Sequence, residues 1–254
     1  MTRFTFVTLG ICALLAMAML FGDPWPALAL IYMTVFAFFM DKISALAQSD
    51  HPGQEFPSGN ALSVTLGLLH FPLLYGGVAA LSSDDALTSL DKLLLFLALS
   101  LFFGQVSNSN AHELIHRTPR LLRRLGVAVY SAILFGHHAS AHVRVHHVHA
   151  ATDHDPNSAR MGESYYAYAP RAWIGALREG GRAEQRLRKG RGPHPYLWYA
   201  SGAVASVAIS FAIGGGAGVL WLLGLSAYAQ AQLLLSDYVQ HYGLRRKEVD
   251  GKPE

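Results

Sequence analysis

Residues 61–81 read ALSVTLGLLHFPLLYGGVAAL, a stretch without a charged side chain. A helix needs about 20 mostly apolar residues to cross a bilayer, so this stretch can form one transmembrane span. Further uncharged runs occupy residues 4–21, 27–40 and 93–106. These runs decide the fold class, and we predict an all-α integral membrane protein.

The last apolar run, residues 196–235, is too long for a single crossing. Gly214, Gly215 and Gly216 lie in its middle and would let the chain turn between two helices. The prediction is therefore about six spans. The composition agrees, because 15% of the residues are charged, whereas soluble proteins carry about 25%. One cysteine, Cys12, excludes an internal disulfide and a four-cysteine zinc site.

Lysine and arginine predict the orientation, because cytoplasmic loops carry an excess of both. With six spans, all 20 of these residues except Lys92 lie on one side of the membrane. We expect a multi-pass inner-membrane protein with both termini in the cytoplasm. The pI near 9.0 is then a topology signal, and no nucleic-acid partner is expected. A signal peptide ending near Ala16-Met17-Ala18 is the alternative, but the apolar run continues past that point.

Most of the 13 histidines lie between His112 and His154, beyond the fourth span, and predict a cytoplasmic histidine-rich cap. The first motif, HELIH at residues 112–116, places two histidines on one helix face. HExxH is also the zinc-protease signature, in which the glutamate acts as a general base. The motif alone therefore leaves the chemistry open.

The second motif, HVRVHH at residues 142–147, favours a larger metal centre. In an α-helix His142 and His146 share a face, whereas His147 is rotated by about 100° and can point to a second ion. A zinc site needs three or four ligands, and the third histidine spacing of the metzincins is missing. Imidazole ligands suit iron, copper, nickel and zinc, so they do not select the metal.

His241 ends the last span at the same level as the two motifs, so three distant segments are expected to converge. We predict six metal ligands: His112, His116, His142, His146, His147 and His241. Four further residues are predicted to support these ligands by hydrogen bonds: Glu113, Asp155, His138 and His149. The isolated His51, His70 and His194 are expected to be ordinary polar residues, although a histidine inside a span is often functional.

These residues resemble the integral-membrane alkane 1-monooxygenases of the membrane fatty acid desaturase and hydroxylase superfamily. HELIHR at 112–117 and HVRVHH at 142–147 resemble the family's first two histidine motifs. DPNSARMGES at 155–164 resembles the segment after the second motif, and DYVQHYGL at 237–244 is similar to the family's His-Tyr-Gly-Leu signature. The resemblance covers essentially the whole chain.

The chain departs from this family in two ways. Ala141 and Val145 stand where the family usually has glutamate and glycine in the second motif. A third histidine motif, which the family has after the His-Tyr-Gly signature, is missing before Glu254. We expect that the chain is truncated at its C-terminus relative to the family, or that His138, His149 or His154 substitute.

The resemblance implies a single membrane-embedded domain, residues 1–254, that holds two iron ions. It implies O₂ activation and hydroxylation of the terminal C–H bond of an alkane or another hydrocarbon or lipid chain. It also implies an electron donor, rubredoxin or ferredoxin, which the basic surface of residues 117–191 could steer.

Three alternatives stay open at the level of sequence. The first is a fatty acyl desaturase, lipid hydroxylase or xylene hydroxylase of the same superfamily. The second is a metal-binding or transport protein, although transporters usually place their ligands near the middle of the membrane. The third is an inactive remnant, consistent with the missing motif.

Overall fold

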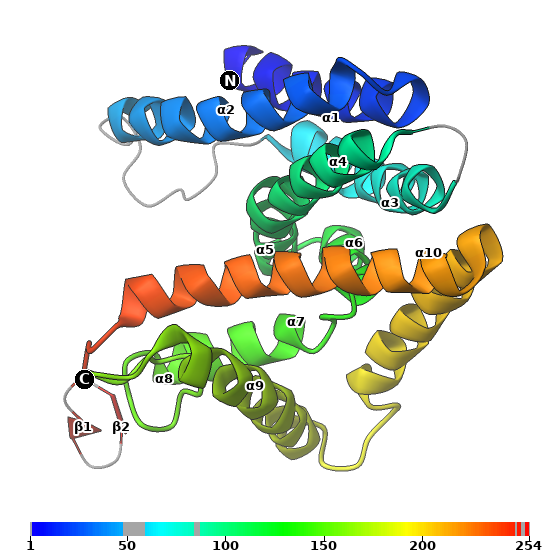
Figure 1. Cartoon of the computed structure of the whole chain (residues 1–254). Helices are drawn as coiled ribbons and strands as arrows, with labels where there is room; N and C mark the ends of the chain where they lie inside the picture. The colour runs from blue at the N-terminus through cyan, green and yellow to red at the C-terminus, as the bar shows by residue number, and fades with distance from the viewer. Residues whose placement is uncertain (1, 48–58, 84–86, 247, 250–251, 254) are drawn as a thin grey trace.

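A computed structural model describes residues 2–47, 59–83, 87–246, 248–249 and 252–253, and most of them are helical. Residues 48–58, which include His51, lie outside the described residues. Helices α1, Thr2–Phe21, and α2, Trp25–Ala47, match the first two apolar runs. They lie side by side at one edge of the molecule and pack on α3 and α4 (Figure 1).

The third and fourth spans form two long helices. Helix α3, Asn60–Ser82, covers the third apolar run. The fourth helix begins at α4, Ser89–Leu101, continues through a π-helical segment η1, Phe102–Ser107, and ends with α5, Asn108–His116. The first histidine motif is therefore the last part of a membrane helix and does not belong to a separate element.

The last span is α10, Pro195–His241, which is interrupted at Gly214 and Gly215. Both residues leave the helical conformation, and Gly215 has φ +57°. Two helical segments therefore meet at an angle, visible as the bend between yellow and orange in Figure 1. A side chain on Gly218 would collide with the backbone oxygen of Ser210. The predicted turn at the three glycines is confirmed.

Among the described residues, three helices are long and apolar enough to cross a membrane, namely Asn60–Ser82, Ser89–His116 and Pro195–His241. Shorter apolar stretches, Thr5–Phe21 and Trp25–Val35, belong to α1 and α2. The prediction of an all-α membrane protein is confirmed.

The remaining elements lie between or after these membrane helices in the chain. They are α6 (Arg120–Ala132), α7 (His138–Ala141), η2 (His142–His146), α8 (His147–His149), α9 (Tyr165–Arg188), β1 (Glu248–Val249) and β2 (Lys252–Pro253). The two short strands pair antiparallel, with Glu248 opposite Pro253. Helices α7, α8 and α9 lie together on one side of α10 (Figure 1).

Buried amides tie the end of the fourth helix to its neighbours. The Nδ2 group of Asn108 donates to the carbonyl of Ala229 in α10 at 2.9 Å, and that of Asn110 donates to the carbonyl of Ser63 in α3 at 3.0 Å. Side-chain hydrogen bonds between membrane helices hold those helices in one relative position. Because α5 carries the first histidine motif, these bonds also fix that motif relative to α10.

Candidate metal centre

Four histidines from the two motifs form one cluster: His112, His116, His142 and His147. Each offers a ring nitrogen, and these nitrogens all lie within 4.8 Å of one another. The Nε2 atom of His142 lies 2.6 Å from that of His112 and 2.8 Å from that of His147. The rings of His112 and His116 are 4.8 Å apart, as expected for one helix face. Several ring nitrogens directed at one point are the arrangement that metal ligands adopt.

The π-helical form of η2 decides which histidines of the second motif join this cluster. A π-helix bonds residue i to residue i+5, so residues five apart lie on one face. His142 and His147 therefore point together, whereas α-helical spacing predicted that His142 and His146 would pair. The ring of His146 still stacks on His142 at 5.2 Å, but its nitrogen bonds elsewhere.

The protonation state of the cluster suits the binding of metal ions. Burial, followed by the neighbouring imidazoles, lowers the pKa of His142 far below its ordinary value. Its ring is therefore neutral at physiological pH and keeps a lone pair for a cation. His116 and His147 are exposed, so the cluster opens on one side.

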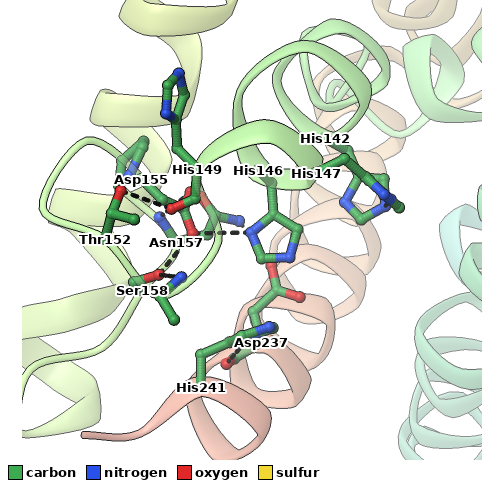
Figure 2. A network of polar contacts seen from close by, with 12 residues as sticks. His142, His146, His147, His149, Thr152, Asp155, Asn157, Ser158, Asp237 and His241 are labelled. Atoms are coloured by element: carbon green, nitrogen blue, oxygen red, sulfur yellow. Dashed lines mark hydrogen bonds and ion pairs between the residues drawn. The ribbon is translucent and has the colours of Figure 1, made fainter. Parts of the chain in front are cut away.

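His146 faces a second polar group, shown in Figure 2. Its Nδ1–H donates to Oδ2 of Asp155 at 2.9 Å, and Ser158 Oγ donates to the same oxygen at 2.7 Å. Burial lowers the pKa of His146, but the hydrogen bond and charge of Asp155 outweigh it, so the pKa is raised. The same contacts lower the pKa of Asp155 although burial opposes them. Asp155 therefore orients His146, and its support of a metal ligand stays a prediction.

His241 reaches this group from the end of α10. Its ring lies 4.7 Å from that of His146, and its Nδ1–H donates to the backbone oxygen of Asp237 at 2.9 Å. After His241 the chain folds back, and the Gly243 amide donates to the carbonyl of Ala159 at 3.1 Å. The six predicted ligands thus converge as two neighbouring groups, one of four histidines and one of His146 with His241.

The other predicted supporting residues lie at the edge of the centre. His138 is buried and stacks on His142 with ring centroids 5.2 Å apart. His149 faces His154 at 5.7 Å, and Glu113 forms an ion pair with Arg117 at 3.2 Å. Their support of the ligands by hydrogen bonds stays a prediction.

Two isolated histidines occupy structural positions. His70 is buried in α3, where its Nδ1 lies 2.7 Å from Ser107 Oγ. His194 caps α10, because its Nδ1 accepts a hydrogen bond from the Tyr196 amide at 3.3 Å.

Two buried partners of the second group were not predicted from the sequence. Asp237 is 9% exposed, and its Oδ2 accepts a hydrogen bond from Asn157 Nδ2 at 2.6 Å. Asp237 lies four residues before His241, one helical turn away, so helical spacing could have indicated it. No comparable spacing relates Asn157 to α10, because that contact joins distant segments.

An arginine clamp holds the loop that carries Asp155. Arg171 in α9 donates to both carboxylate oxygens of Glu163 at 2.7 Å and to the carbonyl of Pro156 at 2.9 Å. Hydrogen bonding to Arg171 lowers the pKa of Glu163.

Comparison with known proteins places the chain in a family. The profile of the fatty acid desaturase family matches residues 92–253, which include both histidine motifs and His241. The chain belongs to the fatty acid desaturase family. Within this family it is similar to alkane 1-monooxygenase 2 of Pseudomonas aeruginosa, with 32% identity over 197 residues, 73% of this chain and 52% of the relative. The predicted resemblance to alkane 1-monooxygenases is confirmed.

Two further relatives are also similar to this chain of the fatty acid desaturase family. Alkane 1-monooxygenase 1 of Pseudomonas aeruginosa is 35% identical over 173 residues, 65% of this chain and 45% of the relative. The xylene/toluene monooxygenase hydroxylase component of Pseudomonas putida is 26% identical over 194 residues, 70% of this chain and 52% of the relative. The chain spans about half the length of these relatives.

Proposed function

We propose that this protein is an alkane 1-monooxygenase-like oxidoreductase that hydroxylates the terminal C–H bond of an alkane or related hydrocarbon chain. One observation carries the proposal: two histidine motifs converge within 4.8 Å at the end of a membrane helix. The named activity of the alkane 1-monooxygenase relatives supports the choice of substrate.

The donor set fits iron. Neutral imidazoles bind iron well, and a carboxylate bonded to the far nitrogen of a ligand is a common support of such sites. The four-histidine cluster would hold one ion, and His146 with His241 would contribute to a second. Two iron ions held by these residues would supply the chemistry of O₂ activation: one atom of O₂ would enter the C–H bond, and the other would leave as water with two electrons from the donor and two protons. The protein would hold the ions, orient the hydrocarbon substrate and exclude water.

The place of the cluster suits a hydrocarbon dissolved in the bilayer. The helix Ser89–His116 has 28 residues and is about 42 Å long at 1.5 Å per residue. A bilayer with its headgroups is about 40–45 Å thick, so His112 and His116 would lie at its surface. We propose that the substrate arrives from the apolar bundle, and that rubredoxin or ferredoxin delivers electrons from the cytoplasm.

We also propose the orientation. Arginine-rich α6 packs against α5, and arginine-rich α9 packs against η2, so both lie beside the histidine motifs. The positive-inside rule would place these two helices and both termini in the cytoplasm, and the protein in the inner membrane.

The test uses the full-length protein in membrane vesicles with ferrous iron, NADH and a reconstituted rubredoxin or ferredoxin system. Octane, p-xylene and an acyl lipid are supplied separately, and the products are identified by mass spectrometry. We expect 1-octanol as the main product. Oxidation of the xylene methyl group alone would favour the second candidate, supported by the xylene/toluene relative. A desaturated lipid, or no product from iron-loaded protein with a reduced donor, would overturn the proposal.

A further inference from the structure

Two buried carboxylates lie beside His146, and they differ in how many hydrogen bonds they accept (Figure 2). Asp155 accepts hydrogen bonds from His146 Nδ1, Ser158 Oγ and the Asn157 amide, at 2.9, 2.7 and 3.1 Å. Asp237 accepts one side-chain hydrogen bond, from Asn157 at 2.6 Å. An ionised carboxylate can accept about four hydrogen bonds. The carboxylate of Asp155 therefore uses most of its capacity to accept hydrogen bonds, whereas the carboxylate of Asp237 can accept further ones.

Asp237 also lacks a cationic side chain as a partner. Within the described part of the chain, no lysine or arginine forms an ion pair with it. A buried carboxylate without a cation is costly, so such groups are usually paired or bind a metal. Asp237 precedes His241 by one helical turn of α10, so the two side chains lie on the same face of that helix.

The two imidazoles nearest to Asp237 are arranged as metal ligands. His146 uses its Nδ1–H for Asp155, and His241 uses its Nδ1–H for a backbone carbonyl. A carbonyl can only accept, so the neutral ring of His241 carries its proton on Nδ1 and has a lone pair on Nε2. The bond to Asp155 favours the same form of His146. The two rings are 4.7 Å apart and nearly perpendicular.

We propose that Asp237 supplies a carboxylate oxygen to a second metal ion, together with His146 and His241. This inference rests on the proposed function, because it assumes an ion separate from that of the four-histidine cluster. The rings of His146 and His241 are 4.7 Å apart, and the ion would draw the three side chains together. The two ions would differ, one bound by imidazoles and the other by imidazoles and a hard, anionic oxygen.

A purely structural role for Asp237 makes a different prediction. In that case Asp237 only accepts the hydrogen bond that ties Asn157 to α10. Asparagine at position 237 keeps an oxygen for this bond but loses the charge. Asp237→Asn therefore distinguishes a role of Asp237 as a metal ligand from a purely structural role. Asp237→Glu keeps the carboxylate. Asp153→Asn is the matched control, because Asp153 is 83% exposed.

The test counts ions in the purified full-length protein in lipid nanodiscs, with Co²⁺ as the probe. Equilibrium dialysis and elemental analysis give the stoichiometry, and the visible absorption of Co²⁺ gives the affinities. We expect two ions in the parent protein and in Asp153→Asn. In Asp237→Asn the second ion should bind at least about 10-fold more weakly, with the first unchanged, and Asp237→Glu should recover part of the loss. In His142→Ala the first ion should be lost and the second retained.

Two results would overturn the proposal: a second ion that binds Asp237→Asn as tightly as the parent, or a parent that binds only the ion removed by His142→Ala. The second result leaves octane hydroxylation to be judged by its own assay. If Asp237→Asn does not fold, infrared difference spectra of the parent labelled with ¹³C-aspartate decide the question. An aspartate carboxylate band must shift with the second equivalent of Co²⁺, and an unshifted band rejects the ligand.

Discussion

His142 and His147 are five residues apart, and their Nε2 atoms lie 2.8 Å from each other. An α-helix turns by about 100° per residue, so it would direct these two side chains differently. The π-helical segment η2 brings them together and turns the intervening His146 toward Asp155. One motif of six residues thereby serves two neighbouring groups of ligands. π-Helical turns are frequent at functional sites, and here the reason is geometric.

Replacing His142 tests the four-histidine cluster. His142→Ala removes the ring nitrogen that lies closest to both His112 and His147. We expect loss of the ion bound there and hydroxylation below about 1% of the parent, a barrier increase of about 2.7 kcal/mol or more. Elemental analysis and product formation from octane measure the two effects. His51→Ala is the histidine control and should keep both; unchanged turnover in His142→Ala would contradict the enzyme assignment.

Replacing Asp155 tests the support of His146. Asp155→Asn removes the negative charge that holds Nδ1 of His146. Loss of such a partner typically weakens metal binding by about 10–100-fold, and we expect this for the ion at His146. Metal titration of the purified protein measures the affinity. Asp153→Asn, a change of the same kind at an exposed site, should bind metal as the parent does. Equal affinities in the two variants would remove Asp155 from the site.

Acid should weaken the clamp between Arg171 and Glu163. The pKa of Glu163 is lowered in the folded protein by its hydrogen bonds to Arg171. The folded state therefore binds this proton less readily than the unfolded state. The stabilisation is complete above the ordinary glutamate pKa and is lost as the pH falls through the lowered one.

Glu163→Gln checks this prediction, because glutamine keeps the shape and cannot ionise. The variant should melt below the parent at pH 7, and the gap should shrink once the pH falls below the ordinary glutamate pKa. Thermal unfolding in detergent at several pH values measures the gap. A gap that stays constant with pH would mean that the charge of Glu163 does not stabilise the loop.

The bend in α10 should depend on the small size of Gly218. Gly218→Ala would press a methyl group against the backbone of Ser210, and overpacking of this kind costs about 1–3 kcal/mol. We expect a lower melting temperature. We also expect His241 to be displaced from the metal site, which would weaken metal binding. Gly216→Ala is the control, because no atom lies within 4 Å of the added carbon. Equal melting temperatures of the two variants would show that the two helical segments of α10 can move apart at little energetic cost.

Uncharged runs predicted the membrane helices well, because burial in lipid is a property of each segment alone. The glycines at 214 and 215 likewise predicted the bend, since they adopt backbone angles that other residues avoid. The pairing of His142 with His147 could not be predicted, because π-helical geometry depends on tertiary packing. The burial of Asp237 against Asn157 has the same cause, as the two residues are 80 positions apart.

The fourth helix is continuous from Ser89, through its π-helical segment, to His116. Its last turns carry His112 and His116, so a tilt of the helix displaces both imidazoles together. A helix that is longer than the bilayer is thick can accommodate the difference by tilting. We therefore expect the acyl-chain length of the surrounding lipids, or the choice of detergent, to shift the positions of His112 and His116 within the histidine cluster.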